Sequence, residues 1–188
     1  MRSRCLALLV FALAACAAPS PDRAVQAPTP SASGDLAARP LRLSTVAPGA
    51  PCPVSPARPW SGAGVAHAVL GDGPLHPVAD YFAAGTILRL RPDDRLPGGG
   101  YEKKVRWIGG AYAGPVLVRA ARLDGAGSAS VRFLYTGERR PDGFFAEIPA
   151  PDADLPATTT VSGPGCYGYQ VDGATFTTAI VFQAAPTP

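Results

Sequence analysis

The sequence predicts an all-β protein, a single antiparallel β-sandwich of about seven or eight strands. Prolines and glycines are frequent, 22 and 21 among 188 residues, and both residue types interrupt helices and form turns. Short runs in which apolar and polar residues alternate recur roughly every ten residues, which is typical of strands in such folds. No stretch carries the apolar period of an amphipathic helix.

The strands expected before the C-terminal pair are short. Within them, Trp107 alternates in phase with Val105 and is assigned to the core. Tyr135 follows Val131 and Phe133 on one face of its run, as period-two alternation requires. The predicted strands cover residues 64–70, 85–91, 103–109, 115–125, 130–135, 144–148 and 158–161.

The last two strands show the clearest pattern. The runs CYGYQV and TFTTAIVFQ each place alternate side chains on one face, Tyr167, Tyr169 and Val171 in the first and Phe176, Ile180 and Phe182 in the second. Asp172 and Gly173 lie between the runs and start a turn. The C-terminal region is therefore predicted to be a hairpin with a buried aromatic face.

The N-terminus has the form of an export signal. Two arginines precede the apolar residues 6–14, a stretch much shorter than the roughly 20 residues that span a bilayer. The sequence LAAC at 13–16 resembles the bacterial lipobox, which implies that residues 1–15 are removed and that Cys16 becomes an acylated first residue. The alternative is an ordinary signal peptide cut after Ala15. The lipobox reading predicts an extracytoplasmic protein anchored in the cell membrane or the outer membrane.

Composition divides the remaining chain into two parts. Residues 16–48 are rich in proline, alanine and serine and poor in aromatics, so they are expected to form a disordered tether. Residues 49–185 are expected to form the sandwich, because they are long enough for one core and show no internal repeat.

The four cysteines are explained by this organisation. Cys5 is lost with the signal and Cys16 carries lipid, which leaves Cys52 and Cys166. Two remaining cysteines outside the cytosol usually pair, so a disulfide is predicted. A catalytic Cys166 is the alternative, because SGPGC superficially resembles the Ser-His-Gly-Cys signature of envelope transpeptidases. Pro164 stands where that family has its histidine, which disfavours this alternative.

The sequence gives little support for a metal site, a carboxylate-based active site or a phosphate-binding loop. His67, Asp72, His76 and Asp80 have no recognisable metal-ligand spacing, and no carboxylate pair or phosphate-binding loop can be nominated. We therefore predict no catalytic residues, no metal and no cofactor. Loss of two arginines with the signal reduces 17 basic residues to 15, against 14 acidic ones, and this balance argues against nucleic acid as a partner.

A family resemblance agrees with the predicted fold. The segments VRWIGGAYAGPVLVRAARLDG and GPGCYGYQVDGATFTTAIVF resemble an uncharacterised family of exported bacterial proteins, many of them lipoproteins, and the likeness covers about residues 50–184. It implies an immunoglobulin-like sandwich whose final hairpin is similar to strands F and G of that fold, and it implies no activity. Because Cys52 stands near the start of the domain, its bond is expected to clamp an edge.

Aromatic side chains are the best candidates for binding. Tyr101 and Tyr112 stand beside glycines in expected loops and are predicted to be exposed. The sequence as a whole predicts a non-catalytic binding module, with an envelope protein or a cell-wall glycan as partner. The alternatives are a structural envelope protein and, less favoured, a surface-anchored hydrolase or transferase. The other aromatics considered are Trp60, Trp107, Tyr135, Tyr167 and Tyr169.

Overall fold

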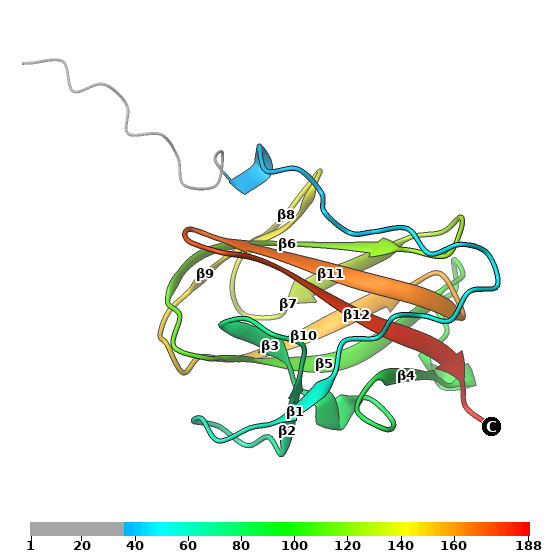
Figure 1. Ribbon diagram of the computed structural model, residues 1–188, viewed down its shortest axis with the longest axis horizontal. Helices are drawn as coiled ribbons and strands as arrows, with labels where there is room; N and C mark the ends of the chain where they lie inside the picture. The colour runs from blue at the N-terminus through cyan, green and yellow to red at the C-terminus, as the bar shows by residue number, and fades with distance from the viewer. Residues whose placement is uncertain (1–35) are drawn as a thin grey trace, which may run out of the picture.

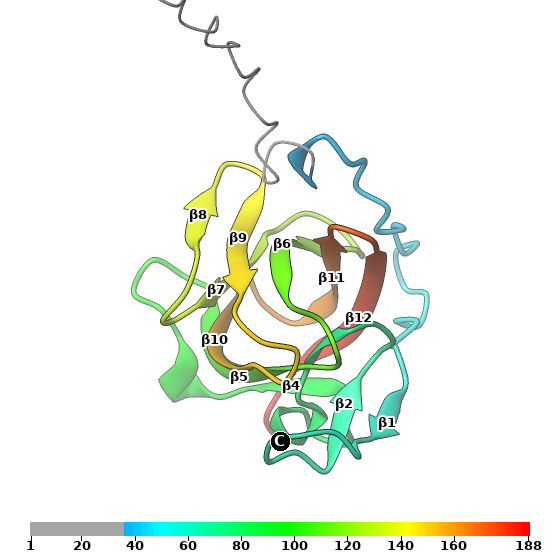
Figure 2. The same cartoon turned by 90° about the vertical axis from the view of Figure 1, so that its left-hand side faces the viewer.

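A computed structural model describes residues 36–188 of the chain. This part of the protein is nearly all β, with twelve strands, and its two main sheets face each other across one core (Figures 1 and 2). The predicted all-β sandwich is confirmed. The predicted signal peptide and Cys16 lie outside the described residues. Among helices in the described part, none is long and apolar enough to cross a membrane.

The sheets differ in size. The smaller sheet runs in the order β3 (Leu75–Pro77), β5 (Tyr101–Gly109), β10 (Asp154–Val161) and β7 (Ala129–Phe133). The larger sheet runs in the order β4 (Ile87–Leu90), β12 (Thr177–Pro186), β11 (Gly165–Gly173), β6 (Gly114–Arg122), β9 (Gly143–Ile148) and β8 (Glu138–Arg140). A separate ribbon joins β1 (Ala57–Pro59) to β2 (Ala68–Leu70), and two 3-10 turns cover Ala79–Tyr81 and Pro92–Asp94.

Pairing within the sheets is antiparallel with one exception in the described chain. Strand β12 pairs with β4 in parallel, so β4 closes the larger sheet beside the C-terminus. Strands β1, β3 and β8 have only three residues each, too few to show an alternating pattern, and they raise the strand count above the predicted seven or eight.

Aromatic side chains fill the core between the sheets. Trp107 is fully buried, as predicted, and its ring meets the edges of Phe133 and Tyr169 at centroid distances of 5.8 and 5.1 Å. Tyr169 also stacks on Phe182 at 4.8 Å. The Tyr169 hydroxyl and Thr159 Oγ1 lie 2.7 Å apart, so this hydrogen bond joins β11 to β10 across the core. Burial raises the pKa of Tyr169.

The C-terminal hairpin forms as predicted. Asp172 lies opposite Thr177, and the chain reverses between them. Phe176 lies in this turn against Gly173, where a Cβ would come within 2.1 Å of the Phe176 ring. Tyr135, in contrast, does not face the core. It is 85% exposed because β7 ends at Phe133 and the alternation ends with it.

Residues 36–56, here called the N-terminal strap, lie along the outer face of the larger sheet before the chain enters β1 (Figure 1). Backbone Val46 donates to the carbonyl of Leu123 at 2.7 Å, and backbone Arg42 donates to Gln170 Oε1 at 2.5 Å. Residues before 49, where composition placed the start of the domain, therefore already contact the sandwich. Prolines and small residues can still bind a sheet through their backbone groups, and composition does not reveal such bonds.

The strap covers a buried polar network on β11 and β6. The side chain of Asp172 is fully buried and pairs with Arg119 Nη2 at 2.5 Å. Thr177 Oγ1 and Gln170 Nε2 donate to the same carboxylate, and Arg119 also donates to the carbonyl of Arg39 in the strap. Strand β11 is therefore covered on both faces, although it alternates aromatic and polar residues.

Candidate functional site

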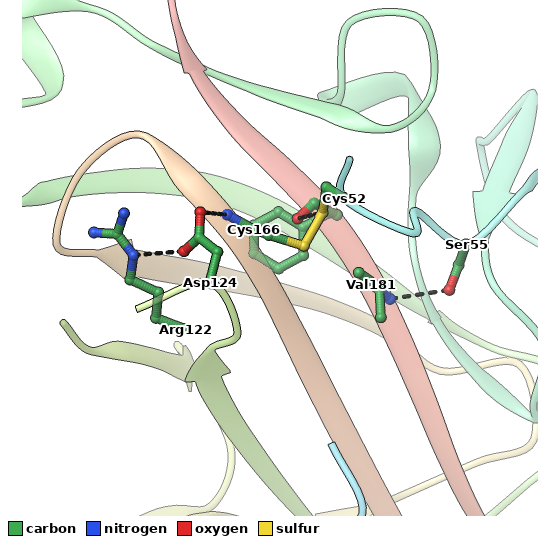
Figure 3. Close-up of a disulfide and its surroundings, with 7 residues drawn as sticks. Cys52, Ser55, Arg122, Asp124, Cys166 and Val181 are labelled. Carbon is green, nitrogen blue, oxygen red and sulfur yellow. Dashed lines mark hydrogen bonds and ion pairs between the residues drawn. A yellow bond between two sulfur atoms is a disulfide. The ribbon is translucent and has the colours of Figure 1, made fainter. Parts of the chain in front are cut away.

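A disulfide joins Cys52 to Cys166, with a Cα–Cα distance of 5.4 Å (Figure 3). The bond predicted from the cysteine count is present, and it leaves Cys166 without a free thiol. Because Cys166 alternates with inward-facing tyrosines, it lies on the outer face of β11 and holds the strap there. Backbone Cys166 donates to Asp124 Oδ2 at 3.0 Å, and Arg122 Nε donates to Asp124 Oδ1 at 2.7 Å. The sulfur of Cys166 is therefore bonded to Cys52, and its backbone N–H is held by Asp124.

The two tyrosines predicted to be exposed are both partly buried. Tyr101 packs against the core cluster at the start of β5. The Tyr112 hydroxyl donates to the carbonyl of Pro115 at 2.7 Å and accepts from backbone Ala174 at 3.1 Å, and its ring meets Phe176 edge-on. Tyr112 therefore ties the start of β6 to the β11–β12 turn.

The four residues considered for a metal site do not come together. His67 Nδ1 and Asp80 Oδ2 lie 3.0 Å apart at the surface, and Asp72 pairs with Arg58 at 2.7 Å. His76 makes neither contact and packs against Trp60. Within residues 36–188, no group of three metal-ligating side chains comes together.

Trp60 and His76 line a surface hollow of about 560 Å³, here called the Trp60–His76 hollow. Four connections meet there. They are the chain from β1 to β2, the turn from β2 to β3, and the loops that follow β5 and precede β10. Figure 1 shows strands β1 and β2 at the lower edge of the molecule. A hollow of this size is in the range of small-molecule sites.

Glycines make room for the hollow. Gly110 follows β5 at its floor, where a Cβ would come 3.3 Å from His76 Nε2 and 3.3 Å from Trp60 Cη2. Gly109 lies against the next loop, because a Cβ there would come 2.6 Å from the carbonyl oxygen of Pro151. A side chain at either position would narrow the hollow or displace one of its walls.

His76 forms the buried part of the wall. Its side chain belongs to β3, and the residue is only 7% exposed. The Nδ1 atom is buried without a hydrogen-bond partner, although buried polar atoms are nearly always paired. Burial lowers the pKa of His76, while the nearby carbonyl groups of Gly71 and Leu70 and the charge of Asp72 oppose this shift. The imidazole is therefore neutral near pH 7 and offers one donor and one acceptor nitrogen.

Trp60 forms the partly exposed wall. Its ring centroid lies 5.6 Å from that of His76, at an interplanar angle of 65°. The indole Nε1 donates to the carbonyl of Ala63 at 2.9 Å, and backbone Trp60 donates to the carbonyl of His67 at 2.9 Å. These two bonds fix the ring in the turn after β1, so its orientation does not depend on a ligand.

Charged groups surround the aromatic walls. Arg58 and Asp72 form an ion pair whose side chains are 55% and 72% exposed, and Asp152 is exposed on the opposite loop. The hollow thus combines an indole, a neutral imidazole, two carboxylates and one guanidinium. Sequence reasoning included Trp60 among the aromatics but did not connect it to His76, because sequence proximity does not show that β1 and β3 meet at the surface.

No protein-family model and no curated protein matches this sequence. Among solved structures, a similarity is found to a family 123 glycoside hydrolase from Clostridium perfringens, studied for glycolipid glycan hydrolysis. The sequences are 10% identical, the TM-score is 0.32, and the likeness covers 54% of this chain and 22% of that one. The matched region spans less than a quarter of the hydrolase, and a likeness at this level establishes neither a shared fold nor shared chemistry.

Proposed function

We propose that this protein is a lipid-anchored, extracytoplasmic binding protein that holds its ligand in the Trp60–His76 hollow without reacting with it. The observation that carries this proposal is the hollow itself. It combines a fixed, partly exposed indole with an imidazole whose Nε2 lies beside Gly110 in the lining. Concave sites with apolar walls and a few oriented polar groups are the usual form of a binding site.

The side chains at the hollow favour binding over catalysis. A hydrolase needs an activated nucleophile, or an acid and a base placed on either side of the bond that is cleaved. Ser61 supplies the hydroxyl at the hollow, and it makes no hydrogen bond to His76 among the interactions of the described chain. The carboxylate of Asp72 is engaged by Arg58. Cys166, the thiol considered for transpeptidase chemistry, is oxidised.

The anchor rests on the sequence motif at Cys16. Residues 17–35 would connect the acylated cysteine to the N-terminal strap. This part of the proposal is tested by expressing the full chain in a bacterium fed a labelled fatty acid. The wild type should carry the label and sediment with membranes, and Cys16→Ser should lose both properties. An unlabelled wild type would contradict the anchor and leave the hollow unaffected.

Binding at the hollow is tested by retention of envelope components. The full-length protein, purified from membranes in detergent, is immobilised and exposed to a detergent extract of the envelope and to purified cell wall. Gly110→Ala adds a methyl group between Trp60 and His76, whereas a Cβ at Gly98 meets nothing within 4 Å, so Gly98→Ala is the matched control. We expect Gly110→Ala to retain less of the envelope component than the wild type, and Gly98→Ala to retain as much as the wild type. Equal retention by both variants would refute a site in the hollow, and release of a cleaved product would refute the non-catalytic role.

A further inference from the structure

We infer that the Trp60–His76 hollow binds an uncharged saccharide, with one sugar ring against the indole and its hydroxyl groups bonded to the polar side chains around it. This inference deepens the proposed function and rests on it. Four observations about the hollow lead to it: its apolar wall, the balance of hydrogen-bond donors and acceptors, the ion pair that Arg58 already makes with Asp72, and the buried imidazole of His76.

The apolar wall calls for a ligand with an apolar face. Trp60, Pro59 and Val69 all line the hollow, and Trp60 packs against the buried cluster that contains Val69. The indole N–H is already bonded to Ala63, so Trp60 offers a ligand its ring and no polar group. A sugar ring presents a face of C–H groups that can lie against such a ring.

The polar groups demand a ligand that donates hydrogen bonds. Carboxylates such as Asp72 and Asp152 are acceptor-only groups, and the neutral ring of His76 adds one acceptor nitrogen. Among the lining residues, Arg58 is the one positively charged hydrogen-bond donor, and its Nε already pairs with Asp72. A ligand with several hydroxyl groups satisfies this set, because each hydroxyl donates to a carboxylate and can accept from Arg58.

The charges disfavour the other ligand classes. An anion such as a phosphate would approach two carboxylates, and the one cation at the site is already paired. A purely apolar ligand would remove water from Asp152 and His76 without replacing their hydrogen bonds, which costs free energy. A cation would be attracted by Asp152 but would leave the donor Arg58 facing a like charge.

The test uses sugar tetramers that differ in charge, in ring substituents and in linkage. The full-length protein in detergent is titrated with tetramers of N-acetylglucosamine, of glucosamine and of glucuronic acid, and with neutral α- and β-linked glucose tetramers. Binding is followed by tryptophan fluorescence, since the chain has two tryptophans, Trp60 at the hollow and Trp107 in the core. Trp60→Phe should abolish the ligand-dependent change and keep the Trp107 emission.

Two variants define the site. Gly110→Ala should weaken neutral-sugar binding about tenfold by crowding the ring, and Gly98→Ala should not change it. Asp152→Asn should weaken it roughly tenfold by loss of a charge-assisted acceptor, and its exposed position leaves folding intact. Tighter binding of soluble tetramers than of insoluble cell wall would identify a free oligosaccharide as the source, and the reverse would identify a wall glycan.

The result that supports the inference is binding of at least one neutral tetramer, with sensitivity to Gly110→Ala. Absence of neutral-sugar binding, preference for the charged tetramers, or equal affinity in both glycine variants would overturn it. The proposed binding function can be tested independently of the saccharide assignment. If neutral sugars do not bind but Gly110→Ala still abolishes retention of some envelope component, the binding role stands and the saccharide assignment falls.

Discussion

The bond between Cys52 and Cys166 should supply a large share of the stability of this domain. The two residues are separated by 114 positions, so the bond closes most of the described chain into one loop. The chain-entropy estimate for a loop of this length is about 4 to 5 kcal/mol. Since domains of this size unfold at a cost of about 5 to 15 kcal/mol, its loss would remove at least about a quarter of the total.

The perturbation is the double substitution of Cys52 and Cys166 by alanine. The folded state should persist, because the strap keeps other bonds to the sheet, including Ser55 to Val181 at 2.9 Å. The expected result is a melting temperature lowered by about 8 to 20 °C, because each kcal/mol corresponds to roughly 2 to 4 °C at this size. The unfolded chain should also become less compact, so the urea m-value should rise.

The assay is urea and thermal unfolding followed by the emission of the buried Trp107, with and without reductant. Reductant should shift the wild type toward the double variant and leave the double variant unchanged, which controls for effects of the reductant itself. If mass spectrometry shows the bond intact in the wild type and the two proteins melt within about 2 °C of each other, less than 1 kcal/mol separates them and the loop-entropy argument is refuted.

Three further predictions concern buried polar side chains. Asp172→Ala should lower the free energy of unfolding by about 3 to 5 kcal/mol, because the largely buried guanidinium of Arg119 loses its carboxylate and keeps only carbonyl partners such as that of Arg39, and urea unfolding that shows a loss of less than about 1 kcal/mol would contradict a desolvated pair. Tyr169→Phe should cost about 1 to 2 kcal/mol in the same assay, since Thr159 loses its buried partner, and an unchanged midpoint would show that water replaces the bond. His76 has a folded pKa below its ordinary value of 6.5, so below about pH 6.5 the unfolded chain binds a proton that the folded chain does not, and stability should fall as pH drops. His76→Gln should flatten the fall in melting temperature between about pH 7 and pH 5, and identical pH profiles would contradict this assignment.

Sequence periodicity predicted the core because core positions repeat along each strand. Trp107 and Tyr169 were assigned to the interior from their alternation with apolar neighbours, and both are fully buried. The disulfide was predictable for a different reason: the predicted export signal and lipobox accounted for the other two cysteines, so counting alone left one pair. Both predictions depend on information that the sequence carries directly: the alternation within one strand, and the small number of cysteines that could pair.

The strap and the hollow could not be predicted in this way. The strap is bound through backbone groups and through Arg39, which donates to Phe176 and Ala174, and such bonds leave no periodic pattern in its sequence. The hollow combines Trp60 with Gly110 and Asp152, which come from loops that are distant in the sequence and are brought together only by the order of the strands. The prediction of exposed aromatics chose Tyr112 because glycines stand beside it. In the structure its hydroxyl bonds to backbone partners, and Gly114 leaves room for that hydroxyl, because a Cβ there would come within 3.2 Å of it.

The strap also connects the proposed anchor to the proposed binding site. An anchor at Cys16 would transmit any pull on the domain into residue 36 and then along the strap toward β1, which carries Arg58 and leads directly to Trp60. Cys52 lies between these points, and its covalent bond passes the load to β11, a strand paired on both sides. With the load diverted in this way, the chain after Cys52 would carry less of it. The position of the disulfide, five residues before β1 begins, would therefore shield the hollow from forces on such an anchor.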